Sequence, residues 1–213
     1  MIPLILRLKK KSHKDIARAQ DILVETLYNA FNDAVFHGGT AIWRCYNGKR
    51  FSEDVDFYLE KDIKKINKFY ELLVKRGFSV EKKKIGKNSL YSTLKFERTV
   101  VRFEALFKTL KSEEKILKEY EKAEGNFITV YTLTPEEIIR EKVEAYFKRL
   151  KVRDLYDIFF LLRYADVSKI KNSLNKFINN FKKPADEKEL RVLIIEGVIP
   201  GVEDMLAYIR RKL

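Results

Sequence analysis

Hydrophobic residues in the first third of the chain repeat first with the period of a helix and then with that of a strand. Over residues 12–34, Ile16, Ala19 and Leu23 recur three or four positions apart, and this spacing predicts a helix with one buried face. Over residues 54–60, polar and apolar side chains alternate, which predicts a strand with one apolar face. The succession of the two patterns indicates a chain that combines helices with a sheet.

Further helices and strands are predicted as far as about residue 132. Residues 62–76 have helical spacing and are followed by Gly77, a residue suited to a helix C-terminus. Residues 111–124 are rich in Lys and Glu and are predicted to form a charged helix that ends before a Gly-Asn pair. Alternation predicts strands over residues 78–84, 90–96, 99–107 and 127–131, with a hairpin loop at residues 86–88.

The chain after residue 132 is predicted to be helical. Thr134, Pro135 and Glu137 form a helix start, because Thr caps the first amides, Pro suits the first helical position and Glu completes the capping box. We therefore expect residues 1–132 to form a mixed or antiparallel sheet with flanking helices. Residues 133–213 are expected to form a helical lobe that completes a cleft. The expected fold class is α+β.

Composition excludes some classes of protein. The chain has 213 residues, of which 46% are apolar, so it can bury a core. No segment approaches the run of about 20 apolar residues that a membrane-spanning helix needs, so no membrane partner is expected. Cys45 is the single cysteine, which leaves no internal disulfide and fits the reducing cytoplasm, where we expect this protein.

Positive charge is concentrated in one segment. The net charge is +13, from 44 Lys and Arg against 31 Asp and Glu. Residues 61–100 hold 12 basic and 4 acidic residues, which gives +8 of that total. Such a segment is either a solvated, lysine-rich surface or a surface that follows the phosphates of a nucleic acid. RNA binding through residues 61–100 is therefore one of two interpretations.

A Gly38-Gly39-Thr40 turn lies between an expected strand and an expected helix. Two glycines allow the backbone to approach a ligand closely, and the amides at the start of the following helix can bind phosphate oxygens. Most turns of this kind bind nothing, so the motif has weight only together with its neighbours.

Carboxylates follow this turn at strand spacing. Asp54 and Asp56 are two residues apart on a predicted strand, so they project from the same face. Neighbouring carboxylates repel each other, and Mg²⁺ with substrate phosphates would relieve the repulsion. The alternative is an edge strand that exposes two acids to solvent. Glu104, on the strand predicted over residues 99–107, is a candidate third ligand or half of an ion pair with Arg102.

In this order the motifs resemble nucleotidyltransferases of the DNA polymerase β type, and more closely the AbiEii/AbiGii toxin family. The resemblance rests on GGTAI at residues 38–42 and on RFSEDVDF at residues 50–57. It continues with Glu-Lys at residues 141–142 and RDLYD at residues 153–157. It covers roughly residues 30–165.

The resemblance implies transfer of a nucleoside monophosphate from an NTP to an acceptor, with release of pyrophosphate. In the toxins the acceptor is typically RNA, such as the 3′ end of tRNA, and an antitoxin protein is a further implied partner. The implied nucleotide-binding residues are Gly38, Gly39, Thr40, Ser52 and Lys142. The implied Mg²⁺ ligands are Asp54, Asp56 and Glu104, and the implied catalytic residues are Asp54, Asp56, Lys142 and Asp154.

Two of these residues also have an ordinary structural explanation. Lys142 lies beside the apolar stripe of its helix, from which a long side chain can reach a cleft, but an amphipathic helix often carries such a lysine. Asp154 could simply cap the helix that it is expected to open.

Three functions remain open from the sequence. The first is a nucleotidyltransferase that acts on RNA as a toxin. The second is a nucleotidyltransferase that modifies a small molecule or a protein, although no acidic cluster suited to a cationic small acceptor lies near the motifs. The third is an inactive fold that binds RNA or protein, which the intact Asp54 and Asp56 disfavour.

Overall fold

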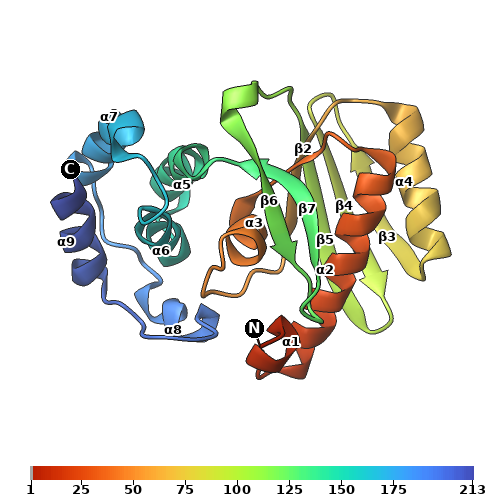
Figure 1. Ribbon diagram of the computed structural model, residues 1–213, viewed down its shortest axis with the longest axis horizontal. Coiled ribbons are helices and arrows are strands. Elements are labelled where there is room, and N and C mark those ends of the chain that lie inside the picture. The colour runs from red at the N-terminus through yellow and green to blue at the C-terminus, as the bar shows by residue number, and fades with distance from the viewer. Residues whose placement is uncertain (1) are drawn as a thin grey trace.

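A seven-stranded mixed sheet organises the first part of the chain in the computed structural model, which describes residues 2–213 (Figure 1). The strands lie in the order β3-β4-β5-β2-β1-β7-β6. β2 runs parallel to β5 and β1 runs parallel to β7, whereas the other neighbours are antiparallel. The strands are β1 (Val35–His37), β2 (Val55–Leu59), β3 (Phe78–Ile85), β4 (Ser89–Phe96), β5 (Thr99–Phe107), β6 (Lys115–Glu121) and β7 (Phe127–Leu133).

Helices cover one face of this sheet and form the rest of the molecule (Figure 1). Tyr28 contacts Phe57 and Phe69 contacts Phe103, with ring centroids 5.9 and 5.1 Å apart. Because Tyr28 and Phe69 belong to α2 and α4, these two helices cover the apolar face of β2 and β5. The helices are α1 (Leu4–Arg7), α2 (Lys11–Ala30), α3 (Gly38–Cys45), α4 (Ile63–Lys75), α5 (Pro135–Arg149), α6 (Val152–Leu161), α7 (Val167–Asn179), α8 (Leu190–Leu193) and α9 (Val202–Lys212), with short 3-10 helices η1 (Ser112–Glu114) and η2 (Glu187–Glu189).

The register of the central strands places polar residues on the opposite face. Phe57 of β2 is completely buried, whereas Asp54 and Asp56 retain some exposure. Asp56 lies opposite Glu104 of β5 and opposite His37 of β1. Because directly opposed residues project to the same side of a sheet, the register gathers these polar groups at one place.

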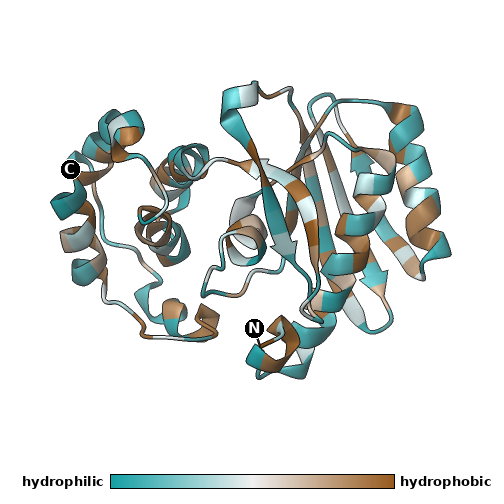
Figure 2. Ribbon diagram, in the orientation of Figure 1, coloured by the Kyte–Doolittle hydropathy of each residue, from teal (hydrophilic) through white to brown (hydrophobic). Residues whose placement is uncertain are grey.

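One hydrophobic core extends from the sheet into the C-terminal helices. It joins Phe36 and Phe57 of the sheet to Leu155 of α6 and Leu206 of α9. Figure 2 shows apolar residues on both sides of the junction, in β7 and in α6. The expected division at residues 132 and 133 falls at the end of β7. Within residues 2–213, no helix combines the length and the hydropathy that crossing a membrane would require.

The α+β fold class expected from the sequence is confirmed. The helix predicted over residues 12–34 is α2, which ends earlier, at Ala30. The strand predicted over residues 54–60 is β2, and the helix predicted over residues 62–76 is α4. α5 begins as predicted, with Thr134 accepting a hydrogen bond from the Glu137 amide at 3.4 Å.

The helix predicted over residues 111–124 is wrong. Ser112–Glu114 form η1, and Lys115–Glu121 form β6 at the edge of the sheet. β6 pairs with β7 along its whole length, from Lys115 opposite Leu133 to Glu121 opposite Phe127. Lys and Glu favour a helix in isolation, but the backbone hydrogen bonds and side-chain packing between β6 and β7 outweigh that preference.

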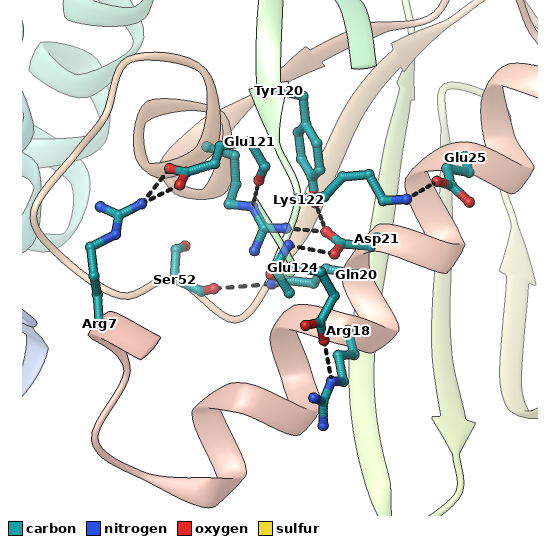
Figure 3. Close-up of polar contacts among 12 residues, drawn as sticks. Arg7, Arg18, Gln20, Asp21, Glu25, Ser52, Tyr120, Glu121, Lys122 and Glu124 are labelled. Carbon is teal, nitrogen blue, oxygen red and sulfur yellow. Dashed lines mark hydrogen bonds and ion pairs between the residues drawn. The ribbon is translucent and has the colours of Figure 1, made fainter. Parts of the chain in front are cut away.

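A buried ion pair fixes α3 against α2 and the β6–β7 hairpin, in the region that Figure 3 shows. Asp21 of α2 accepts hydrogen bonds from Arg44 of α3, from the Tyr120 hydroxyl at 2.9 Å and from the Ala123 amide at 2.7 Å. Arg44 Nε also donates to the carbonyl of Glu121 at 2.6 Å. Since both charges are buried and have several partners, the pair holds the C-terminal end of α3, the helix that begins with the two glycines.

Candidate active site

The turn between β1 and α3 brings the glycine backbone against the acidic strand. Gly38 has φ +76°, in the left-handed region that favours glycine. A Cβ at Gly38 would overlap Oδ2 of Asp56, and a Cβ at Gly39 would lie 2.5 Å from Nη2 of Arg50. Both contacts are closer than an ordinary Cβ makes, so the packing around this turn favours glycine at both positions.

Thr40, the third residue of the turn, is a structural link. Its side chain is completely buried, and its hydroxyl donates to the backbone carbonyl of Asp54. Thr40 therefore ties the start of α3 to the start of β2. The structure does not bring its hydroxyl to the cavity wall, where its two glycine neighbours lie.

Three carboxylates, those of Asp54, Asp56 and Glu104, line the cavity where β2 pairs with β5. Burial raises the pKa of Asp56 above its ordinary value, and the nearby Asp54 adds to this effect. Desolvation and the charges of Asp56 and Asp54 likewise raise the pKa of Glu104. Arg102 donates to Asp54 from Nε at 2.6 Å, so the alternative that Arg102 pairs with Glu104 is wrong.

The donor set fits a divalent cation that substrate phosphates complete. Within residues 2–213, no three Asp, Glu, His or Cys side chains are already gathered closely enough to hold a metal ion. Burial first, and the neighbouring carboxylates second, raise the pKa values of Asp56 and Glu104, and a bound cation would stabilise the charged form of both side chains. Carboxylate pairs that share Mg²⁺ with phosphate oxygens are a common arrangement, and glycine at position 38 avoids a side chain that would overlap the carboxylate of Asp56.

A buried charge network from α5 and α6 forms the opposite wall. Lys142 Nζ lies 2.7 Å from Oδ2 of Asp157 and 3.5 Å from Oδ1 of Asp154. Arg50, from the loop before β2, makes two hydrogen bonds of 2.6 Å to the carboxylate of Asp157. Burial alone would raise the pKa of Asp157, but the charges of Arg50 and Lys142 hold it below its ordinary value.

Asp154 is not a helix cap, so that alternative is wrong. α6 begins at Val152 with Lys151 in the N-cap position, and Asp154 lies inside the first turn. Its carboxylate is completely buried and accepts two hydrogen bonds of 2.7 Å from Arg149. Asp154 lies behind Lys142 and does not line the cavity.

A cavity of about 270 Å³ lies between the sheet and helices α5 and α6. Seven of the expected site residues line it, namely Gly38, Gly39, Ser52, Asp54, Asp56, Glu104 and Lys142. The rest of the lining is His37, Arg50, Glu141, Ala145, Arg149 and Arg153. The structure therefore joins residues more than one hundred positions apart in the sequence around one space.

The cations of this cavity differ in how they are paired. Arg50, Lys142 and Arg149 each bind a buried carboxylate. Within residues 2–213, Arg153 has no carboxylate partner, and its Nε is buried without a hydrogen-bond acceptor. Arg153 is thus the lining cation that can contact an anionic ligand without first breaking an ion pair.

Sequence reasoning gave no role to several residues that shape this site. Arg50 and Asp157 lie inside the quoted motifs, but nothing in the sequence indicates that they bind each other. His37 stacks on Tyr58 with ring centroids 4.0 Å apart. Nδ1 of His37 lies 3.3 Å from Oε2 of Glu141, and the Tyr58 hydroxyl donates to Oε1 of the same carboxylate. These pairs depend on how α5 and α6 pack on the sheet.

Gln20 also shapes the site, and a feature of the sequence could have indicated it. It follows Ile16 and precedes Leu23 at helical spacing, so a polar residue stands within an apolar stripe. In the structure it is completely buried, and its side-chain amide donates to the carbonyl of Ser52 (Figure 3) and to that of Glu53, at 3.0 Å each. Gln20 thereby holds the loop that leads into Asp54.

Comparison with solved structures shows a shared fold. JHP933 from Helicobacter pylori is 18% identical, with 95% of this chain and 90% of that chain covered and a TM-score of 0.65. Another H. pylori structure, described provisionally as a nucleotidyltransferase, is 20% identical, with 96% and 94% covered and a TM-score of 0.66. The antibiotic-resistance factor ANT(2'')-Ia is 13% identical, with 75% and 91% covered and a TM-score of 0.50. No curated protein matches this sequence.

A family comparison covers most of the chain. The family described as "Nucleotidyl transferase AbiEii toxin, Type IV TA system" matches residues 21–201. That span contains the glycine turn, the carboxylates of β2 and β5, and the charged residues of α5 and α6. This protein therefore belongs to the AbiEii family of nucleotidyl transferase toxins.

Proposed function

We propose that this protein transfers a nucleoside monophosphate from an NTP to RNA, with release of pyrophosphate, as the toxin of a toxin–antitoxin pair in the cytoplasm. One observation carries the proposal. A glycine turn at a helix start, a group of carboxylates and a buried lysine surround a single cavity of about 270 Å³. This arrangement offers amides and cations to phosphates, and carboxylates to a cation that the phosphates share.

The triphosphate would lie between the α3 turn and the wall formed by α5 and α6. The amides of Gly38 and Gly39 and the hydroxyl of Ser52 would donate hydrogen bonds to its oxygens. Lys142 would exchange its contact with Asp157 for a phosphate oxygen, because Arg50 remains to balance the charge of Asp157. Arg153, which has no carboxylate partner among the residues that the structure describes, would add a second cation.

Asp54 and Asp56, with Glu104 beside them, would hold Mg²⁺. When bound, Mg²⁺ would neutralise the charge that develops on the transferring phosphate and the leaving pyrophosphate. The half-exposed side chain of Arg102 would turn away from Asp54 to free this carboxylate. Asp154 would act through others, because it is buried behind the cavity and orients Lys142 and Arg149.

RNA is the proposed acceptor because of charge and family. Residues 61–100 carry most of the net charge and form α4, β3 and β4, beside the strands that bear the carboxylates. The donor site would be the same for a protein or small-molecule acceptor, so the acceptor has to be identified by experiment. An antitoxin that blocks this reaction is the further proposed partner.

The proposal is tested by a transfer assay. The protein is incubated with each α-labelled NTP and total tRNA, with and without Mg²⁺, beside the Asp54→Asn/Asp56→Asn variant. We expect label in RNA with the wild type and Mg²⁺, and none with the variant or with EDTA. Label on protein would show that the protein transfers nucleotides, but to a protein acceptor rather than to RNA. If no NTP gave labelled product with tRNA or with a wider panel of acceptors, although the protein bound RNA, the proposed enzymatic activity would be refuted. The protein would then be an RNA-binding module.

Growth of the producing cells provides an independent test of the toxin role. Induced expression of the wild type should arrest growth. The Asp54→Asn/Asp56→Asn variant, produced at the same level, should leave growth unchanged. Equal growth arrest by both proteins would show that toxicity does not depend on the carboxylates.

A further inference from the structure

The uncovered side of β3, β4 and β5 carries four basic side chains among polar and apolar ones next to the cavity. On β4 and β5 every second residue is buried toward α2 and α4, and the residues between them are exposed or half-buried. On β3, Lys83 turns to the covered side, where its Nζ lies 4.1 Å from the ring centroid of Tyr70 of α4. The open face, as we call it, consists of Ser79, Lys82, Lys84, Ser89, Tyr91, Thr93, Lys95, Arg102 and Glu104, with Val100 and Leu106 at the two ends of β5.

The register of four strands makes the open face continuous with the carboxylates. Asp56 lies opposite Glu104, Glu104 lies opposite Tyr91, and Tyr91 lies opposite Lys84. Since neighbouring strands are about 4.8 Å apart, this row of four residues spans about 14 Å across the sheet. A polymer that has its end at Asp56 and follows this row would pass over Tyr91 and leave the sheet at Lys84.

Tyr91 provides the central contact of that row. Its ring is half-buried and lies 5.6 Å from Nζ of Lys82, and its hydroxyl lies 3.3 Å from Oγ1 of Thr93. An accessible aromatic ring next to lysines is the combination that binds single-stranded nucleic acid, because bases stack on the ring and phosphates bind the cations. The bases of a duplex are stacked on each other and cannot reach such a ring.

We propose that the open face binds the single-stranded end of the acceptor RNA, with one base stacked on Tyr91 and the backbone phosphates near Lys82 and Lys84. The proposal rests on the proposed function, since it places the terminal hydroxyl beside Asp56 and Glu104. The open face carries four cations and the carboxylate of Glu104. Asp54, which accepts a hydrogen bond from Arg102, borders it at the cavity end, and the exposed Glu81 lies at the bulge of β3. The NTP and the RNA end then approach the carboxylates from opposite sides, the NTP from α3 and α5, the RNA from β4 and β3.

Binding can be measured apart from catalysis with a fluorescent single-stranded RNA that lacks its terminal 3′-hydroxyl. Fluorescence anisotropy compares Lys82→Ala/Lys84→Ala with Lys64→Ala/Lys68→Ala. Both double variants remove two exposed lysines from residues 61–100, but Lys64 and Lys68 lie on α4, which covers the opposite side of the sheet. We expect the first variant to weaken binding at least tenfold and to reduce the slope of log K against log salt by about 1.4. The second should bind as the wild type does.

Tyr91 separates stacking from charge. Tyr91→Ala should weaken binding of the single-stranded RNA about tenfold, whereas Tyr91→Phe should retain it, because stacking needs the ring and not the hydroxyl. Blunt duplex RNA of the same length should be insensitive to Tyr91→Ala. Far-UV circular dichroism of each variant establishes that the fold is intact before binding is compared.

Several outcomes would overturn the open face as the RNA site. Equal losses from the two lysine variants would indicate diffuse charge attraction, and an unchanged Tyr91→Ala would exclude stacking. A wild type that binds a fluorescent NTP analogue and labels a protein or a small molecule, but binds no RNA, would overturn this inference and leave nucleotidyl transfer intact. Tyr91-dependent RNA binding without NTP binding would support the open face and refute the donor site.

Discussion

At the scale of single residues, Asp157 shows how a buried charge positions the candidate site. It is completely buried, and its partners Arg50 and Lys142 come from the loop before β2 and from α5. The loop before β2 and the consecutive helices α5 and α6 therefore depend on one carboxylate. Removing one partner from such a group leaves the remaining charges buried and uncompensated. The resulting loss of folding free energy is larger than the net stabilisation that the intact ion pair provides.

Asp157→Asn should lower the free energy of unfolding by about 3–5 kcal/mol at pH 7. Arg50 and Lys142 hold the pKa of Asp157 below its ordinary value in the folded state. The stability due to this carboxylate is therefore fully present above the unfolded pKa of about 3.9 and is lost as the pH falls through the folded pKa. The difference between wild type and variant should thus be constant from pH 7 to 5 and shrink below about pH 4.

Urea unfolding at several pH values measures this difference. Asp33→Asn, which changes an exposed carboxylate, is the matched control and should give a difference near zero at every pH. A difference for Asp157→Asn that stayed the same down to the acid limit of folding would contradict the assignment, because the lost interaction would then not be the ionic one.

Gly39 tests whether the α3 turn determines activity rather than stability. In Gly39→Ala the new methyl group would lie 2.5 Å from Nη2 of Arg50 and 2.7 Å from Oγ of Ser52. The Ser52 side chain can rotate away, whereas Arg50 is held by Asp157 and can shift only slightly, so the fold should survive with a small loss of stability while the cavity changes shape. A displacement of about 1 Å in a positioned group can reduce a rate about 100-fold, and we expect a loss of that order in nucleotidyl transfer.

Gly86→Ala is the control for that substitution. Gly86 lies in the β3–β4 hairpin, where a Cβ would be 3.4 Å from the nearest atom, the carbonyl oxygen of Ser89. Transfer rates and thermal unfolding midpoints should be measured for both variants. Equal rates for Gly39→Ala and the wild type would show that the turn does not touch the nucleotide.

Residue types and spacing were sufficient to find the carboxylates and the glycine turn, because strand alternation alone places Asp54 and Asp56 on one face. They were not sufficient to assign ion-pair partners. Arg102 binds Asp54 rather than Glu104, and Arg149 binds Asp154, because the packing of the elements sets which charges meet. Partner choice among many Lys, Arg, Asp and Glu residues is a tertiary property.

At the scale of elements, α2 supports the loop that carries Asp54. Gln20 projects from the buried face of α2 and donates both side-chain hydrogens to the carbonyls of Ser52 and Glu53. Gln20→Ala leaves these carbonyls without that donor, so the loop should become more mobile. We expect kcat to fall about tenfold, about 1.4 kcal/mol, which is within the range for the loss of two hydrogen bonds, with a smaller change in KM.

Hydrogen exchange over residues 50–54 provides a readout that a general loss of stability would not mimic. Exchange there should accelerate in Gln20→Ala while the amides of β5 remain protected. Arg18→Ala is the control on the same helix, since Arg18 forms an exposed ion pair with Glu124 that contributes little. Unchanged exchange in the loop would refute the positioning role of Gln20.

The one element with the wrong predicted structure is explained by its neighbours. The Gly-Asn pair at residues 125–126 predicts the end of a helix, but Gly125 has φ +92° in the turn of a β-hairpin. The Lys122 amide donates to the Asn126 carbonyl at 2.8 Å, which closes the hairpin. A glycine with positive φ suits both a helix C-terminus and a hairpin, so only the pairing of β6 with β7 distinguishes them.

At the scale of the whole molecule, the cavity depends on two parts that share one core. The sheet supplies the carboxylates, α3 supplies the glycine turn, and α5 and α6 supply the cations. Apolar residues of α3, α6 and α9 belong to the same buried cluster as those of the sheet. The junction is also fixed by the buried contact between Arg50 and Asp157. The boundary expected at residues 132 and 133 is thus a change in secondary structure within a continuous core.

A continuous core predicts that both parts unfold together. Trp43 is the only tryptophan and lies on α3, so its fluorescence reports on the first part. In a Trp43→Phe background, Tyr208→Trp would place the probe on α9, where Tyr208 packs on Phe159 with ring centroids 5.0 Å apart. Urea midpoints from the two probes, each compared with the circular dichroism midpoint of the same variant, should coincide, because coincident transitions are the mark of two-state unfolding. An earlier transition on α9 would show that the helical part opens by itself, and the cavity would then be able to open to solvent while the sheet remains folded.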